Sequence, residues 1–312
     1  MDLQAQWAGF LNVHKPPGLS SHGVVAAVRH LLPKGVKVGH LGTLDPDACG
    51  VLPLALGWAT RTIPYFPPAR KAYRAEVQLG VETDTLDASG QVVSRAPVPP
   101  LEEGELRALI ARGEGPQWQV PPQVSAVHVN GRRAYHLSRE GSQFELPARQ
   151  VEFYKLELLQ WEAGGRLLVD LFCSPGTYVR AWARDLGRQL GCGAHLSFLL
   201  RLESGFFKLE GAWTIGDLEE KGVYAALLPL KETLMQAVGR IAYLPEQRFQ
   251  GGQDYLQFST SEGEDWKSPE VASGEEWVVC RAESGSFLGL GRTVDSPGGV
   301  ALRLERLLEK GA

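Results

Sequence analysis

Residues 39–61 read GHLGTLDPDACGVLPLALGWATR, a glycine-rich segment followed by an apolar run. The first half is a loop in which three glycines permit positive backbone angles and Pro46 restricts one. The second half, residues 50–59, is apolar and is predicted to be buried. Asp45 therefore lies on an irregular segment with a buried support, which is how a catalytic acid, base or nucleophile is presented.

A simpler interpretation of Asp45 stays open at this point. Asp-Pro is a common turn pair, so Asp45 could merely cap a turn. The loop is not a phosphate-binding loop, because it lacks the Gly-Lys-Ser/Thr ending and no strand-to-helix dinucleotide fingerprint surrounds it.

Length and composition indicate a globular protein with one large domain and a smaller one, since 312 residues are 44% hydrophobic. No apolar run reaches the length of a membrane span, and the first ten residues lack the layout of a secretory signal, which predicts a cytoplasmic protein. The four cysteines have no CxxC spacing, so we expect no metal site and no disulfide framework, only free and mostly buried thiols. They are Cys49, Cys173, Cys192 and Cys280.

Charge is distributed unevenly along the chain. Residues 1–222 hold 23 Lys and Arg against 23 Asp and Glu, whereas residues 223–312 hold 9 against 13, which accounts for the net charge of -4. Two local basic clusters could contact nucleic acid or could be ordinary solvated surface. The first contains Arg61, Arg70, Lys71 and Arg74, and the second contains His128, Arg132, Arg133, His136 and Arg139.

Residue patterns predict several elements around the loop. Residues 10–15 read as a strand before a Pro-Pro-Gly turn, and the alternating segment at residues 72–80 reads as a half-buried strand that opens with Tyr73. Residues 101–112 form a scaffold helix. Thr177 is the expected N-cap of a helix on which Arg180, Arg184 and Arg188 share a face, and such a stripe is most often solvated.

Seven motifs in order resemble the TruB family of tRNA pseudouridine synthases: KPPGLSS, GHLGTLDP, KAYRAEVQLG, TDTLDASG, VPPQVSA, VNGRRAY and CSPGTYVRAWARDLG. The resemblance implies an α+β pseudouridine synthase fold, with a mixed, largely antiparallel central sheet flanked by helices and loops, in residues 1–239. It also implies a small β-rich PUA-like domain in residues 240–312, where short β-type segments alternate with acidic connectors.

The resemblance also assigns roles to residues by position. Asp45 is the expected catalytic carboxylate, Tyr73 lies against the target base, and Arg180 pairs with the aspartate. By the same resemblance His40 supports the disrupted RNA loop, and Tyr178 and Leu199 wall the uridine pocket. The charge pattern, and not the resemblance, predicts that Arg132 and Arg133 of the second basic cluster contact RNA, and Lys15 beside its turn is either a phosphate contact or an ordinary exposed lysine. Three positions depart from the family pattern: Val124 and His128 replace a usual Tyr and Lys, and Leu200 replaces a common Arg.

The activity implied by the resemblance is isomerisation of uridine to pseudouridine at position 55, in the T-loop of tRNA, by base flipping. It needs no cofactor, and we expect a monomer that requires no protein partner and no membrane. Two alternatives stay open, namely a dyskerin-type subunit that works with guide RNA and a non-catalytic RNA-binding or chaperone module. The absence of basic terminal extensions disfavours the first, and the intact Asp45, Tyr73 and Arg180 disfavour the second.

Overall fold

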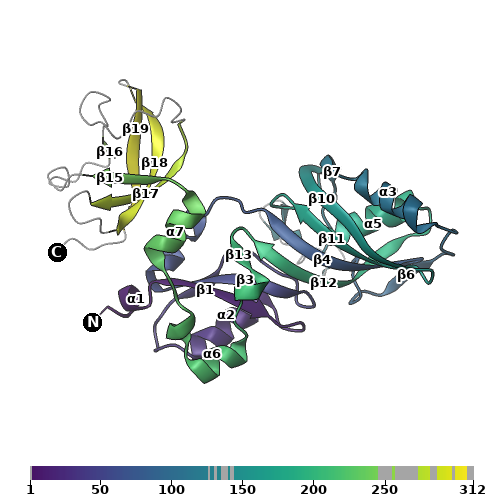
Figure 1. Ribbon diagram of the computed structural model, residues 1–312, viewed down its shortest axis with the longest axis horizontal. Helices are drawn as coiled ribbons and strands as arrows, with labels where there is room; N and C mark the ends of the chain where they lie inside the picture. Colours follow the sequence, from purple (N-terminus) through teal and green to yellow (C-terminus); the bar gives the residue numbers. More distant parts are fainter. Residues whose placement is uncertain are drawn as a thin grey trace.

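The computed structural model describes residues 2–125, 127–129, 132–134, 140, 144–244, 255–256, 273–281, 287–296 and 299–307. Two large β-sheets organise these residues, one of ten strands and one of five strands near the C-terminus (Figure 1). Helices flank the ten-stranded sheet, and its strands pair antiparallel except for one parallel pair. The expected mixed, largely antiparallel sheet with a small C-terminal β-sheet is therefore confirmed.

The ten-stranded sheet runs through eight strands in one path. In spatial order they are β14 (Leu228–Pro229), β1 (Gly9–Lys15), β3 (Cys49–Leu56), β12 (Ala194–Ser204), β4 (Lys71–Leu79), β11 (Arg166–Cys173), β10 (Arg149–Glu162) and β7 (Gly115–Gln119). Two short strands lie beside this path: β2 (Val38–His40) pairs with β3, and β13 (Phe207–Lys208) pairs with β12.

Strand β3 is buried along its whole length, as its apolar sequence predicts. Its alternate residues enter two different hydrophobic clusters. Leu52 and Leu54 pack with α2 (Ser21–His30) and α6 (Ile215–Lys221), whereas Val51 and Ala55 pack with α7 (Leu230–Val238). Both faces of β3 are thus covered, and this gives the loop before it a rigid support.

The parallel pairing of β3 with β12 requires a glycine at position 50. Arg201 lies opposite Gly50 in the register, and a Cβ on Gly50 would stand 2.2 Å from the Arg201 carbonyl oxygen. Gly50 also has φ +101°, a conformation that other residues rarely adopt. This close approach joins the end of the Asp45 loop to the middle of β12.

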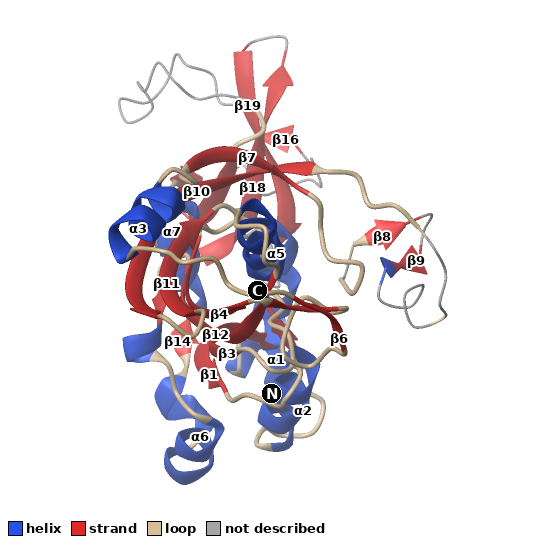
Figure 2. Ribbon diagram, turned by 90° about the vertical axis from the view of Figure 1, so that its right-hand side faces the viewer, coloured by secondary structure: helices blue, strands red, loops and turns tan. Residues whose placement is uncertain are grey.

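The other half of the sheet is covered by α3 (Glu103–Ala111) and α5 (Val179–Gln189), which pack on β12, β4, β11 and β10 (Figure 2). The scaffold helix predicted at residues 101–112 corresponds to α3, whose Leu106 and Ile110 are buried. The expectation that Thr177 caps α5 is wrong. Tyr178 is the N-cap, and the Thr177 hydroxyl donates instead to the Ser174 carbonyl, because residues 174–177 form a turn before the helix.

The C-terminal sheet has the order β15 (Ile241–Leu244), β17 (Glu276–Arg281), β18 (Phe287–Ser296), β19 (Gly299–Leu307) and β16 (Tyr255–Leu256). Its Val278 and Leu290 pack against Leu234 of α7 and Phe10 of β1. The remaining elements are short: α1 (Leu3–Gln6), η1 (Gly57–Tyr65), η2 (Leu209–Gly211), η3 (Val223–Ala226), and the strand pairs β5 (Val81–Thr83) with β6 (Val92–Arg95) and β8 (His128–Val129) with β9 (Arg132–Arg133).

All four cysteines are free and buried, as their spacing predicts. Among the described residues, no helix is both long and apolar enough to cross a membrane.

Candidate active site

Asp45 is held by contacts on both of its sides. The Ser21 hydroxyl, in the first turn of α2, accepts from the Leu44 N–H at 2.8 Å and donates to the Leu44 carbonyl at 2.9 Å. On the other side, the Lys15 ammonium donates to the carbonyls of Pro46 at 2.7 Å and Ala48 at 2.5 Å. The Asp45 side chain between these anchors keeps 43% of its surface exposed, so a substrate can reach it.

Lys15 is buried, whereas a contact with RNA phosphate would need an exposed lysine. A lysine beside a Pro-Pro-Gly turn was expected to reach RNA phosphate, but Lys15 is fully buried and its ammonium also donates to Pro16. Burial lowers the pKa of Lys15 to about 8, while the three carbonyl acceptors favour the charged form. Lys15 therefore fixes the backbone of the Asp45 loop and is not available to phosphate.

Arg180 of α5 forms an ion pair with Asp45. It lies in the first turn of α5, is 4% exposed, and places Nε 2.9 Å from Asp45 Oδ2. Its Nη1 donates to the Thr85 carbonyl at 2.9 Å and its Nη2 to the Val124 carbonyl at 3.0 Å. The Nε–H is not directed at the carboxylate, since Nε has no hydrogen bond of normal geometry, so the contact with Asp45 is an ion pair without a directed bond.

The arginine stripe on α5 is thus not one solvated face. Arg180 and Arg184 are buried, and Arg184 donates to the Val120 carbonyl and to Asp185. Arg188, one turn further along, is exposed. Arg180, the first arginine of the stripe, therefore belongs to the site, whereas Arg188, the third, lies on the surface.

A second carboxylate, Asp87, also contacts Arg180. Its Oδ2 lies 3.3 Å from Arg180 Nη1, while its Oδ1 accepts from the Thr85 and Ser89 hydroxyls. The residue before it, Leu86, has φ +65°, which is uncommon for a residue with a side chain. The DTLDAS sequence of this turn does not by itself show that Asp87 and the Thr85 carbonyl converge on one guanidinium.

Tyr73 lies on β4 opposite Arg201 of β12. Tyr73 is 6% exposed, and burial raises the pKa of its hydroxyl to about 12, so the phenol is neutral. Arg201 lies against this hydroxyl, is fully buried, and donates to the carbonyls of Val51 at 2.6 Å, Thr43 at 3.3 Å and Gly42 at 3.2 Å. Arg201 was missed from sequence, although a charged residue within an apolar strand is an unusual signal.

Leu199 and Tyr178 flank the same region. Leu199 is 9% exposed and shares one hydrophobic cluster with Tyr73 and Leu44. Tyr178 precedes α5, where its backbone N–H donates to the Gln119 side chain at 2.8 Å and the Arg149 guanidinium stacks 4.6 Å from its ring centre. Leu199 thus packs in the cluster that holds Leu44, the residue before Asp45, and Tyr178 precedes Arg180 by two residues in the chain.

His40 is half-buried on β2, five residues before Asp45. Burial, with Arg201 next in importance, lowers the pKa of His40, so its imidazole is neutral at pH 7. Its Nδ1 is buried and has no hydrogen-bond partner among the described residues. The fold therefore leaves this ring nitrogen without a hydrogen bond, which is uncommon for a buried polar atom.

The predicted RNA-contact residues Arg132 and Arg133 lie on β9, in a hairpin away from the main sheet (Figure 2). Arg132 is exposed and pairs with Glu140 at 2.5 Å. Of the three departures from the family pattern, Val124 offers its carbonyl to Arg180, Leu200 pairs with Cys49 and Arg74 in β12, and His128 lies on β8. His136 and Arg139 of the second basic cluster fall outside the described residues.

Solved structures place the fold in a known class. A chain in the crystal structure of a Cbf5–Nop10–Gar1 complex aligns with a TM-score of 0.70 and 26% identity, over 99% of this chain and 86% of that chain. A chain in an H/ACA ribonucleoprotein bound to a substrate RNA containing 2'-deoxyuridine aligns with a TM-score of 0.67 and 24% identity, over 99% and 87%, which supports the fold alone. The fold is that of the pseudouridine synthases.

Sequence comparisons narrow the class to a family. Residues 29–179 match the TruB family pseudouridylate synthase (N terminal domain), and residues 180–238 match the tRNA pseudouridylate synthase B C-terminal domain. The tRNA pseudouridine synthase B of Moorella thermoacetica is 50% identical over 227 residues, 71% of this chain and 74% of that protein. That of a Synechococcus species is 42% identical over 299 residues, 94% and 95% of the two chains. This chain belongs to the TruB family and is an isomerase that forms pseudouridine in tRNA.

Proposed function

We propose that the enzyme isomerises the uridine at position 55, in the T-loop of tRNA, and that Asp45 is its catalytic carboxylate. The observation that carries the proposal is the pairing of a half-exposed carboxylate with a buried arginine, Asp45 with Arg180 at 2.9 Å. A buried guanidinium stabilises a neighbouring negative charge more strongly than an exposed one, because water screens it less. Asp45 combines access to substrate with a fixed partner.

The reaction breaks the C1′–N1 glycosidic bond of uridine and forms a C1′–C5 bond to the rotated base. A proton leaves C5 and N1 ends protonated, so atoms and electrons balance without an oxidant or a reductant. The Asp45 carboxylate can serve this reaction by attack on the sugar, by attack on the base, or by assisting elimination, and all three need it ionised and close to the nucleotide.

The residues around Asp45 support binding of an extruded base. Tyr73 offers an aromatic ring with a neutral hydroxyl, Leu199 belongs to the same hydrophobic cluster, and Tyr178 lies two residues before Arg180 in the chain. An enzyme that acts on a base removes it from the stack and holds it between aromatic and apolar side chains. We assign Tyr73, Leu199 and Tyr178 to the uridine pocket and His40 to the RNA that surrounds the extruded base.

RNA loops suit such a site, because their bases are splayed out at a cost of only a few kcal/mol. We assign catalysis to residues 1–239 and additional RNA binding to residues 240–312. We further propose that the chain acts as a monomer without a guide RNA or protein partner.

The test uses purified protein alone with two transcripts, an unmodified tRNA and the same tRNA with cytidine in place of uridine 55. Pseudouridine is then mapped at single-nucleotide resolution. The proposal predicts pseudouridine at position 55 of the first transcript and none in the second. Modification at another uridine would overturn the assigned position, and activity only after adding a guide RNA and partner proteins would favour the guided class.

A further inference from the structure

Tyr178, the residue before α5, is contacted by two residues that face each other across neighbouring strands. Gln119, at the end of β7, and Arg149, at the start of β10, are opposite each other in the antiparallel register. The side chains of such a pair lie on the same face of the sheet, within contact distance of each other. Both contact Tyr178, one through its backbone and one through its ring.

Gln119 bonds both backbone polar groups of Tyr178. Its Oε1 accepts from the Tyr178 N–H at 2.8 Å, and its Nε2 donates to the Tyr178 carbonyl at 3.1 Å. Gln119 is 3% exposed, and Tyr178, the N-cap of α5, makes no cap hydrogen bond with its own side chain. A buried amide whose donor and acceptor are both used fixes the extended backbone of the N-cap and so the point from which α5 starts.

Arg149 contacts the ring of Tyr178. Its guanidinium carbon lies 4.6 Å from the ring centre, which is a cation–π contact, and its Nη2 donates to the Gly176 carbonyl. Gly176 has φ +85°, so the turn before Tyr178 takes a shape that favours glycine. A planar cation that lies over one face of an aromatic ring and is itself anchored restricts the orientation of that ring.

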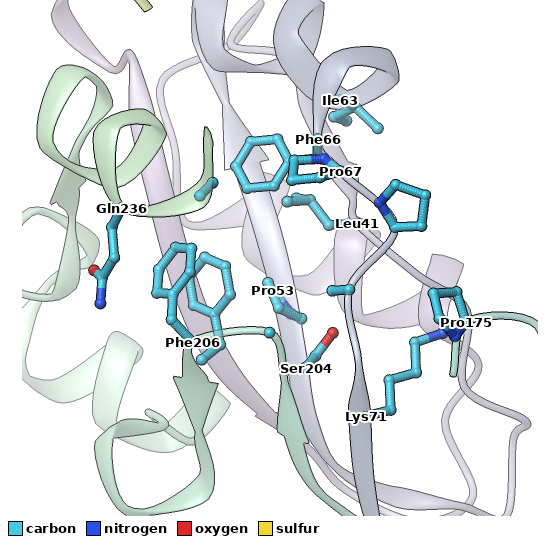
Figure 3. Close-up of a pocket in the computed structure, with 15 residues that line it drawn as sticks. Leu41, Pro53, Ile63, Phe66, Pro67, Lys71, Pro175, Ser204, Phe206 and Gln236 are labelled. Carbon is cyan, nitrogen blue, oxygen red and sulfur yellow. The ribbon is translucent and has the colours of Figure 1, made fainter. Parts of the chain in front are cut away.

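The turn at residues 174–177 has an open side. Pro175 in this turn lines a cavity of about 440 Å³ (Figure 3). A group that faces a cavity lacks packing partners on that side. Ser174 joins the start of the turn to β10, so the end of the turn depends on the contacts of Gln119 and Arg149.

The segment that follows Gln119 also contacts the arginines of α5. The Val120 carbonyl accepts from Arg184 at 3.2 Å, and the Val124 carbonyl accepts from Arg180 at 3.0 Å. Residues 119–124 are therefore joined to α5 at its N-cap and within its first two turns. A shift of the N-cap would displace Arg180, which forms the ion pair with the candidate catalytic carboxylate.

We propose that Gln119 and Arg149 are positioning residues for the uridine pocket, with Gln119 setting the backbone of Tyr178 and the start of α5, and Arg149 setting the orientation of the Tyr178 ring. The inference rests on the proposed function in one respect, that Tyr178 is a wall of that pocket. Neither residue needs to touch the nucleotide, because both act through Tyr178. A displacement of about 1 Å in a group that orients a reactant can cost about 10²-fold in rate.

The first test separates positioning by Gln119 from a role in folding. In single-turnover reactions with all tRNA bound, Gln119→Leu should lower the rate constant at least about ten-fold. A variant that is only partly folded would instead show fewer binding sites in a tRNA titration and an unchanged rate constant. Gln117→Leu is the matched control, since Gln117 lies two residues earlier on the same face of β7 and donates to the Gly113 carbonyl. It should keep the wild-type rate constant.

A double-mutant cycle tests whether Arg149 acts through the ring. Arg149→Met keeps an apolar stem and removes the guanidinium. It should slow the reaction at least about five-fold with Tyr178 present and have no further effect in a Tyr178→Ala enzyme. Arg166→Met is the control, because Arg166 is an exposed residue of β11 whose ion pairs with Glu76 and Glu162 are 3.9 Å long. It should have no effect in either background.

A measurement without turnover keeps the inference separate from the proposed function. Fluorine NMR of the free enzyme, with fluorotyrosine incorporated, reports on the Tyr178 ring, and the loss of one signal in Tyr178→Phe identifies it. Arg149→Met should shift this signal, and Arg166→Met should leave it in place.

Three results would overturn the inference: a Tyr178 signal that Arg149→Met does not move, an equal effect of Arg149→Met with and without the Tyr178 ring, or equal rate constants for Gln119→Leu and Gln117→Leu. Modification of a uridine other than that at position 55 by the wild-type enzyme would overturn the proposed position alone, because neither the cycle nor the NMR signal depends on which uridine is the target.

Discussion

The guanidinium of Arg180 joins two carboxylates, Asp45 at 2.9 Å through Nε and Asp87 at 3.3 Å through Nη1. The arginine side chain is 5% exposed, whereas the side chains of Asp45 and Asp87 are 43% and 20% exposed. One buried cation thus bridges an open carboxylate and a more enclosed one. Asp87 and the carbonyls of Thr85 and Val124 hold the guanidinium in place beside Asp45.

Replacement of Arg180 should reduce kcat far more than replacement of Arg188, the third arginine on the same helix. We expect Arg180→Ala to reduce kcat on the order of 10²-fold or more, because Asp45 and Asp87 lose their shared cation. Arg188→Ala is the matched control, since Arg188 is exposed on the same stripe. Single-turnover assays at saturating tRNA measure both, and equal effects of the two substitutions would mean that Arg180 has no special role.

Two substitutions at the exposed Arg132 and its partner Glu140 should change tRNA affinity in opposite directions. If Arg132 and Arg133 contact phosphate, Arg132→Ala with Arg133→Ala weakens tRNA binding and lowers its salt slope by about one to two units. Because Arg132 pairs with Glu140 at 2.5 Å, Glu140→Gln frees its charge and should tighten binding. Filter binding across a salt series measures both effects. An unchanged slope in the double variant assigns these arginines to ordinary solvated surface.

Stability should rise in alkaline solution because of Lys71. The pKa of Lys71 is about 8 in the folded chain, because burial lowers it, and is near the ordinary lysine value of 10.5 in the unfolded chain. Between these two pH values the unfolded state binds more protons, so the free energy of unfolding increases with pH in this window. Urea denaturation at pH 7.5 and 9.5 should show a smaller gain for Lys71→Met than for the wild type. Lys208→Met should match the wild type, and a Lys71→Met gain as large as the wild-type gain would contradict the burial effect.

Removal of residues 240–312 should cost stability and tRNA affinity without abolishing catalysis. The C-terminal sheet buries Val278 and Leu290 against Phe10 and Leu234, so truncation after Gly239 uncovers apolar surface and should lower the free energy of unfolding by at least about 2 kcal/mol. The truncated chain should still convert uridine at saturating tRNA and low temperature, since its catalytic residues are intact. A truncated protein that is folded and saturated but inactive would place a catalytic role in the C-terminal part.

Local sequence patterns predicted the strands whose burial follows from their own apolar or alternating residues. The apolar run before Gly57 gave β3, and alternation after Tyr73 gave β4. Lys15 and Arg201 could not be placed in this way, because their burial depends on distant partners. Lys15 is buried by the Asp45 loop, and Arg201 reaches Gly42 and Thr43 only through the parallel pairing of β12 with β3.

Asp87 shows the same limit. Its turn has ordinary turn residues, and nothing in the spacing of residues 83–90 indicates an arginine about 90 residues later in the chain. The contact arises because β12 and α5 bring the turn and Arg180 together, with Leu196 donating its N–H to the Leu86 carbonyl. Sequence patterns report local structure, whereas these contacts depend on the topology of the sheet.

The most direct test of the proposed role of Asp45 is single-turnover formation of pseudouridine by Asp45→Asn, with Asp47→Asn as the control. Asn keeps the shape of the side chain and removes its charge, and Asp47 is an exposed acid two residues away in the same loop. We predict that Asp45→Asn binds unmodified tRNA with an affinity within a few-fold of the wild type and forms no pseudouridine at position 55, while Asp47→Asn remains active. Measurable turnover by a folded, tRNA-bound Asp45→Asn enzyme would contradict the account.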